Sequence, residues 1–127
     1  MGFGILRLMK TKFILHGGYT SEENELNRSY FSEMVNDVPE NGTILIVYFA
    51  CDEEGVEGKY QRDLKRFRSF AGDRSISIVK ATEEDFIEQL KASDVVYIRG
   101  GETDMLLEVL RQFPEFKTLI SGKTVSG

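Results

Sequence analysis

The chain has 127 residues, which is enough for one domain with a single hydrophobic core and too few for two. Hydrophobic residues make up 41% of it and charged residues 29%, as in ordinary globular domains, so disordered and fibrous classes are excluded. The net charge of −5 argues against a surface for nucleic acid or anionic membranes, because both need clustered lysine and arginine.

One cysteine, Cys51, and one histidine, His16, limit the chemistry of the chain. A single cysteine excludes an intramolecular disulfide and a zinc site built from several cysteines, and it fits a reducing compartment such as the cytoplasm. A metal site would have to be rich in carboxylates, and no such spacing is present, so we expect neither a metal nor a cofactor. No apolar run approaches the ~18 residues of a membrane-spanning helix.

The first residues, MGFGILRLM, are too short for a signal peptide and lack its cleavage site. Because Met9-Lys10 has the form of a natural start, residues 1–8 are predicted to be an N-terminal extension or a cloning remnant. Residues 9–127 are then a single domain.

Short apolar runs and helical periodicities alternate along the rest of the chain. Strands are predicted at residues 12–15, 43–50, 75–80, 95–98 and 123–126. Helices are predicted at 26–38, about 59–71, 83–92 and from 103 onward, the last interrupted at Pro114 and resuming through 116–120. Thr20 and Glu23 have capping-box spacing before the first helix, the acidic stretch 51–58 with its two glycines is predicted to be a loop, and Thr82 is the expected cap of the third helix.

The segment 43–50, TILIVYFA, is apolar on both faces, which is typical of a central parallel strand covered by helices on both sides. Strict alternation of strands and helices predicts βαβ units with right-handed crossovers. We therefore expect an α/β fold of the doubly wound, flavodoxin-like kind. It has a mostly parallel five-stranded sheet with helices on both faces, in three α/β/α layers.

Ligands bind such sheets at the carboxyl ends of the strands. The most informative loop there lies within residues 94–110, DVVYIRGGETDMLLEVL, which predict a strand, a paired-glycine turn and a helix. The amides of Gly101, Glu102 and Thr103 would lie at a helix N-terminus, which favours a carboxylate, a phosphate or an oxyanion. A tight corner without a ligand is the alternative. The other residues predicted at this edge are His16, Gly17, Gly18, Cys51, Arg99, Gly100 and Ser126.

The order of motifs resembles the aspartyl dipeptidases of the peptidase E family: HGG after the first strand, YFA ending the second, IRGGET before a leucine-rich helix, and then GKTVSG. The resemblance covers residues 13–127. It implies a class I glutamine-amidotransferase-like fold and serine-dependent hydrolysis of dipeptides with N-terminal aspartate, with Gly100 and Gly101 helping to form the oxyanion hole. Glu102 stands where the family has asparagine, and a carboxylate there would repel an oxyanion unless it points away.

In the family, the fifth strand leads into a Gly-x-Ser-Ala-Gly nucleophile elbow, and the acidic and histidine partners follow later. This sequence ends at Gly127, before such an elbow, and Ser126 lies on the strand side of that turn. His16 follows the first strand, and the family's catalytic base does not come from that position. We therefore expect no catalytic residue in the chain as given, since a serine without a base is a poor nucleophile near neutral pH.

Other interpretations stay open. Cys51 and His16 form a catalytic dyad if their strands are neighbours. Alternatively, Cys51 or Ser126 acts as a nucleophile in a site completed across subunits. The acidic neighbours of Cys51 disfavour a thiolate. Arg99 is a candidate partner for an acidic ligand, and the carboxylates 52–54 for a divalent cation. The turn 100–103 also suits a flavodoxin-like anion or nucleotide binder. A phosphoacceptor receiver domain is excluded because the third strand ends at Lys80-Ala81 and not at an aspartate.

In the family, segments beyond the elbow cover part of the sheet. If their absence exposes ~400 Å² of apolar surface, the lost burial is roughly 10 kcal/mol, which is comparable to the whole stability of a domain. We therefore expect a homo-oligomer, a dimer or a tetramer, in which another copy covers the exposed sheet by face packing or by edge-strand pairing. The non-catalytic alternative is a homo-oligomeric module that binds a small anionic ligand, an acidic amino acid or peptide, at Gly100-Gly101.

Overall fold

The structure is a computed structural model of the 127-residue chain, and it describes residues 3–8, 10–16 and 22–127. The strands are β1 (Gly4–Leu8), β2 (Thr11–Leu15), β3 (Thr43–Val47), β4 (Ser77–Lys80), β5 (Val95–Ile98) and β6 (Thr124–Ser126). The helices are α1 (Glu25–Asn36), α2 (Glu53–Ala71), α3 (Phe86–Ala92), α4 (Thr103–Leu110) and α5 (Phe116–Leu119). Within the described residues, no helix is both long enough and apolar enough to cross a membrane.

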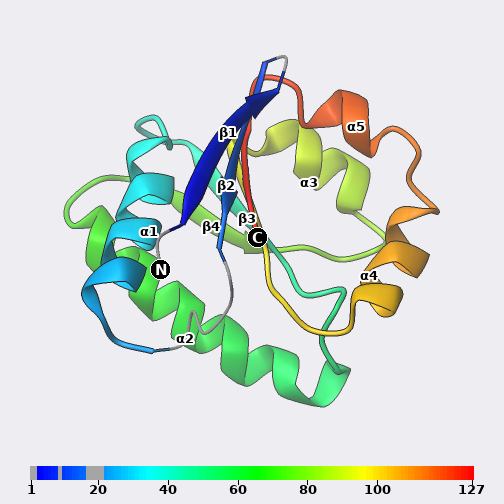
Figure 1. The fold of residues 1–127 in the computed structure, drawn as a ribbon, viewed down its shortest axis with the longest axis horizontal. Helices are drawn as coiled ribbons and strands as arrows, with labels where there is room; N and C mark the ends of the chain where they lie inside the picture. The colour runs from blue at the N-terminus through cyan, green and yellow to red at the C-terminus, as the bar shows by residue number, and fades with distance from the viewer. Residues whose placement is uncertain (1–2, 9, 17–21) are drawn as a thin grey trace.

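The described strands form one sheet in the order β1-β2-β6-β5-β3-β4 (Figure 1). The strands from β2 to β4 in this order pair in parallel, and only β1 is antiparallel, with Gly4 opposite Leu15 and Leu8 opposite Thr11. The α/β class and the mostly parallel sheet are thus as predicted. The number of strands differs, because residues 4–8, within the predicted N-terminal extension, form β1.

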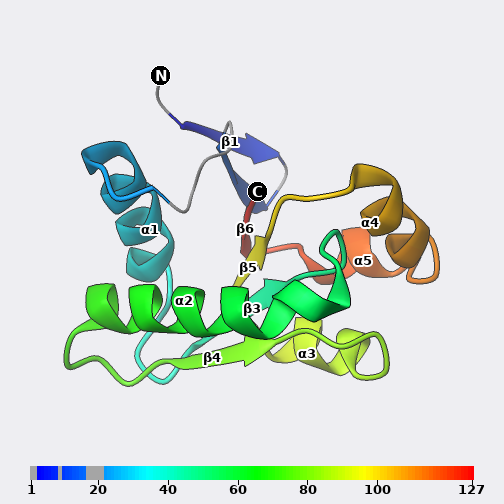
Figure 2. The ribbon, with the colours of Figure 1, turned by 90° about the horizontal axis from the view of Figure 1, so that it is seen from below.

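Helices pack on both faces of the sheet (Figure 2). The chain moves toward β4 through α1 and α2 and back toward β6 through α3, α4 and α5. Since parallel crossovers are right-handed, opposite directions of travel place these two sets of helices on opposite faces. We call the two sides of the sheet the α1–α2 face and the α3–α5 face. Alternate residues of β3 follow this division, with Ile44 and Ile46 in the core of the first face and Leu45 and Val47 in the core of the second.

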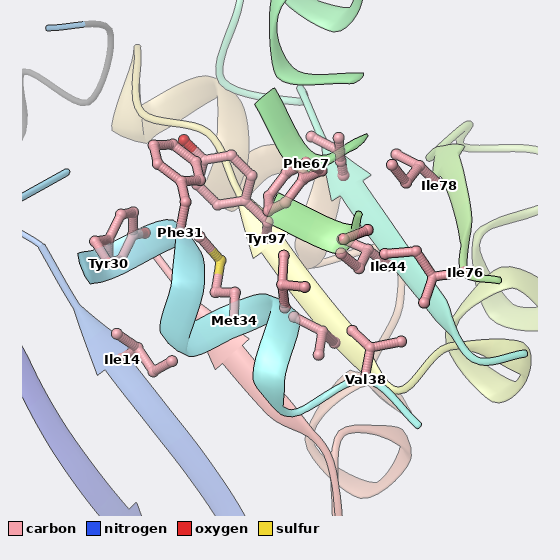
Figure 3. Packing of buried hydrophobic residues seen from close by; sticks show 14 of the residues in the cluster. Ile14, Tyr30, Phe31, Met34, Val38, Ile44, Phe67, Ile76, Ile78 and Tyr97 are labelled. Atoms are coloured by element: carbon pink, nitrogen blue, oxygen red, sulfur yellow. The ribbon is translucent and has the colours of Figure 1, made fainter. Parts of the chain in front are cut away.

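An aromatic cluster joins α1 and α2 to the centre of the sheet (Figure 3). Phe31 of α1, Phe67 of α2 and Tyr97 of β5 are buried, and their ring centroids lie 5.4 to 5.8 Å apart in edge-to-face arrangements. Such geometry adds to the stabilisation that burial of the rings provides. The cluster therefore fixes β5, the strand that leads into the paired-glycine turn.

The predicted strands agree with the structure more closely than the predicted helix starts do. β3 to β6 lie within their predicted ranges, and β2 begins one residue early. Helix α1 is capped by Asn24, whose side chain accepts a hydrogen bond from the Asn27 amide at 2.8 Å. The predicted capping box instead used Glu23 and Thr20, and Thr20 lies outside the described residues.

Two other helices begin at different residues from those predicted. Helix α2 begins at Glu53, within the predicted loop, because Val56 packs against the core of the α1–α2 face. The two glycines of that predicted loop, Gly55 and Gly58, are accommodated in the helix. Helix α3 begins at Phe86, since Thr82 accepts a hydrogen bond from the Asp85 amide at 3.2 Å and thus closes a turn before the helix.

Candidate functional site

Strands β3 and β5 are neighbours whose following segments leave in opposite directions. The chain continues from β3 through α2 toward β4, and from β5 through α4 toward β6, on opposite faces. In parallel sheets, ligands bind in the crevice outside the carboxyl ends of two such strands. The segment after Val47 and the turn after Ile98 therefore define the edge at which we expect a site.

At this point the two segments are in direct contact. The Glu102 amide donates a hydrogen bond to the Ala50 carbonyl oxygen at 2.7 Å. A Cβ atom on Gly101 would lie 2.2 Å from that oxygen, so only glycine allows the approach. The Cys51 thiol lies 3.5 Å from the Gly100 carbonyl oxygen. These residues form a closed corner, which we call the Ala50–Gly101 corner.

The corner changes which amides are available to an anion. Of the three that the sequence predicts, the Glu102 amide is already a donor within the protein, whereas Gly101 and Thr103 lie on either side of it at the opening of α4. The Glu102 residue is exposed. Gly100 is exposed too, and a Cβ atom there would meet nothing within 4 Å, so the space beside its Cα atom is open.

A pocket of about 380 Å³ lies beside this corner, at the carboxyl ends of β2, β5 and β6. We call it the β6 pocket. It lies toward the α3–α5 face, since its apolar wall includes Val125, Leu106 and Phe116, all of the core on that face. Its lining is Phe13, Leu15, Ala50, Ile98, Arg99, Gly100, Gly101, Thr103, Leu106, Phe116, Val125, Ser126 and Gly127.

Arg99 takes part in a buried polar cluster on the opposite face. Its Nε atom lies 3.1 Å from Oδ2 of Asp63 in α2, and the Tyr48 hydroxyl donates a hydrogen bond of 2.7 Å to the same oxygen. Burial raises the pKa of the Asp63 carboxyl group, and the hydrogen bond from Tyr48 and the charge of Arg99 oppose that rise. The guanidinium predicted to meet an acidic ligand therefore already has a carboxylate partner within the protein.

Asp63 and Tyr48 are not among the predicted site residues, although the helical spacing of Asp63 contains a signal. The segment from Lys59 to Arg68 combines many charged residues with an apolar stripe of Tyr60, Leu64 and Phe67. Asp63 lies three residues after Tyr60 and four before Phe67, both on that stripe, so its carboxylate is carried into the protein. A carboxylate at a stripe position predicts a buried partner.

The predicted dyad of Cys51 and His16 is not formed. It required their strands to be neighbours, but β6 and β5 lie between β2 and β3. Three inter-strand spacings of about 4.8 Å separate the two strands by roughly 14 Å. The His16 Nε2 atom lies instead 2.7 Å from Oδ1 of Asn27, and its ring centroid lies 4.5 Å from that of Tyr30.

The remaining predicted residues lie in different surroundings. The Ser126 hydroxyl group is buried, 2.8 Å from the Met34 sulfur atom. Gly17 and Gly18 lie outside the described residues. The carboxylates 52–54 are exposed at the start of α2, and within the part of the chain that the structure describes no group of three or more His, Cys, Asp or Glu side chains is arranged to hold a metal ion.

Comparisons of the chain with protein-family models, curated proteins and solved structures find no match. The resemblance to peptidase E therefore stays a prediction that depends on the order of motifs.

Proposed function

We propose that this chain is a peptidase E-like domain that binds a small acidic molecule, an amino acid or a short peptide, in the β6 pocket and does not hydrolyse peptide bonds by itself. The observation that favours this function most is the position of the pocket. It lies at the carboxyl ends of β5 and β6, against the backbone of Gly100 and Gly101 and next to the opening of α4.

The electrostatics at this position favour an acidic ligand. The first amides of a helix lack partners within it, and the helix dipole is positive at that end. Thr103, the first residue of α4, lines the pocket together with the exposed Gly100. Because the other walls are largely apolar side chains, interactions with these dipoles are screened less than in water.

The positions of the candidate catalytic groups support binding without hydrolysis. The Ser126 hydroxyl group faces Met34, and the His16 ring contacts Asn27 and Tyr30. Cys51 follows β3 and His16 follows β2, and β6 and β5 lie between those two strands. A nucleophile needs a base within hydrogen-bonding reach, and the contacts described for these groups are instead to Asn27, Tyr30, Met34 and the Gly100 carbonyl oxygen.

We propose for the fold the doubly wound, flavodoxin-like class with three α/β/α layers, to which β1 adds an antiparallel edge strand. The reversal of chain direction at β3 and β5, with helices on both faces, supports it. The compartment that we propose is the cytoplasm, where a free thiol such as that of Cys51 stays reduced.

A second candidate function is assembly, and the hairpin of β1 and β2 favours it. Leu6 and Leu15 are 45% and 51% exposed, although both belong to sheet strands. The pairing of Leu6 with Phe13 places Leu6 and Leu15 on the same side of the hairpin as Phe13, a wall of the β6 pocket. We propose that a second copy of the chain covers this surface.

Calorimetry with two dipeptides tests the binding proposal. Asp-Leu should bind more tightly than Asn-Leu, which has the same shape without the acidic side chain. Leu15→Asp places a carboxylate in the lining of the pocket and should weaken binding of Asp-Leu by about tenfold relative to Leu15→Asn. Leu107→Asp, at an exposed leucine outside the lining, is the matched control and should leave binding unchanged.

Two results contradict the proposal. Equal binding of the two dipeptides, or no binding of either, would contradict the proposal that the ligand is acidic. Release of free aspartate, or labelling of the chain by a fluorophosphonate, removes the statement that the protein does not hydrolyse peptide bonds.

A further inference from the structure

A second cavity, of about 690 Å³, lies on the other side of the Ala50–Gly101 corner. We call it the α2–α4 cleft, because the first turns of α2 and one side of α4 form its walls and the turn after β4 closes it. Its lining is Tyr48, Phe49, Cys51, Glu53, Val56, Glu57, Lys80, Ala81, Thr82, Glu83, Glu84, Met105, Glu108 and Val109. None of these residues lines the β6 pocket.

The inner part of the cleft is apolar. Tyr48 and Ala81 are buried side chains at the ends of β3 and β4, and Phe49 and Val109 are partly buried beside them. Met105 of α4 is a large apolar side chain with 37% of its surface exposed. Methionine adapts its shape readily, which suits the wall of a site that accepts an apolar group.

The charged lining residues are of one sign with a single exception. They are five glutamates and Lys80, whose Nζ atom lies 3.2 Å from Oε2 of Glu57. Within the described residues, the ion pairs do not involve the other four, which are Glu53, Glu83, Glu84 and Glu108. The charged lining residues of the cleft thus sum to a net negative charge.

We propose that the α2–α4 cleft binds a small organic cation, an ammonium group attached to an apolar body. Carboxylates around a hollow with low-dielectric walls raise the local concentration of cations, and the apolar inner surface accepts the body of the ligand. The volume lies within the range of small-molecule sites. A metal ion is the poorer occupant, since these carboxylates form no group of three or more suited to hold one in the part of the chain described.

Two probes of similar shape separate charge from hydrophobicity: 2-phenylethylamine and 2-phenylethanol. Titrated into isotopically labelled protein, the amine should shift the amide resonances of Ala81, Met105 and Val109. It should bind about tenfold more tightly than the alcohol, and high salt should remove most of that difference. Equal affinity of amine and alcohol, or shifts by the amine confined to Leu15 and Gly100 in the β6 pocket, would overturn the proposal.

A charge-matched pair of variants completes the test. Glu84→Gln with Glu108→Gln removes two carboxylates of the cleft and should weaken binding of the amine by about tenfold. Glu25→Gln with Asp73→Asn removes two exposed carboxylates elsewhere and should leave binding unchanged. Equal weakening by both pairs would show only a response to net charge, and the site would be refuted. The binding of acidic dipeptides in the β6 pocket is measured separately, so either proposal can fail alone.

Discussion

Gly101 is the residue on which the turn after β5 depends. Its missing side chain lets the Ala50 carbonyl group approach, and that carbonyl accepts the hydrogen bond from the Glu102 amide. Gly100 precedes it in the same turn but faces open space. The paired glycines are therefore not equivalent, although the sequence predicted one role for both.

Gly101→Ala should destabilise the protein by about 2 to 4 kcal/mol, because the new Cβ atom displaces the Ala50 carbonyl and weakens its hydrogen bond. Gly100→Ala should change the free energy of unfolding by no more than about 0.5 kcal/mol. Urea unfolding monitored by circular dichroism measures both. Equal effects of the two substitutions would contradict the closed corner.

Asp63 gives the protein a specific dependence of stability on pH. Burial raises its folded-state pKa above the ordinary value of 3.8, so the folded protein keeps a proton on Asp63 at pH values where the unfolded chain has lost it. Where the folded state binds more protons, the free energy of unfolding falls as pH rises. The stabilisation that the extra proton on Asp63 gives the folded state is therefore lost as pH rises from the ordinary carboxyl range through the raised pKa.

Asp63→Asn should remove that dependence, because the amide does not ionise and still accepts a hydrogen bond from Tyr48. Urea unfolding of both proteins at several values from pH 4 to pH 8 measures the effect. As pH rises, the stability of the natural protein relative to Asp63→Asn should decrease. A relative stability that increases with pH would mean that Tyr48 and Arg99 lower the pKa of Asp63 below its ordinary range.

At the level of secondary structure, the sequence predicted strands well because parallel strands are continuous apolar runs with glycine or charge at their ends. Helix starts were harder, since tertiary packing decides them. In α2, contact of Val56 with the core outweighs the low helix propensity of Gly55 and Gly58, and the helix begins at Glu53. Propensity alone could not reveal that contact.

The glycines of α2 lead to a prediction about stability. Gly58 lies within the helix, and a Cβ atom there would meet nothing within 4 Å. Gly58→Ala should therefore stabilise the protein by about 0.5 to 1 kcal/mol, because alanine loses less backbone entropy in a helix. Gly72→Ala is the control at the end of the same helix. Its φ of 61° disfavours alanine, so it should destabilise by about 1 kcal/mol or more. Thermal unfolding of both variants checks the signs, and a loss of stability in Gly58→Ala would mean that α2 begins after it.

For the whole molecule, the alternation of strands and helices predicted the α/β class, but local sequence does not determine strand order. The order places β6 and β5 between the strands of His16 and Cys51, which rules out their pairing. It also brings Ala50 against Gly101, some fifty residues apart in sequence, and so separates two cavities at one edge. Apolar patterning showed which loops share that edge but not which of them touch.

The open edge of the sheet leads to a prediction about assembly. Among the strands that the structure describes, β1 pairs with β2 alone, so its other side presents backbone groups that these strands leave unpaired, and Leu6 and Leu15 add exposed apolar surface. Two copies of β1 paired antiparallel about Leu6 would set Arg7 of one copy opposite Ile5 of the other, so no like charges meet. The strand is thus compatible with its own copy.

We expect a dimer or a tetramer at micromolar concentration, measured by light scattering after size-exclusion chromatography. Leu6→Lys should shift the protein toward a folded monomer, because two lysines would face each other at the centre of the paired strands. Leu107→Lys adds the same charge at another exposed leucine, on α4, and should leave the assembly intact. A well-folded monomer of the natural sequence would refute assembly through this edge, and equal dissociation of both variants would place the interface elsewhere.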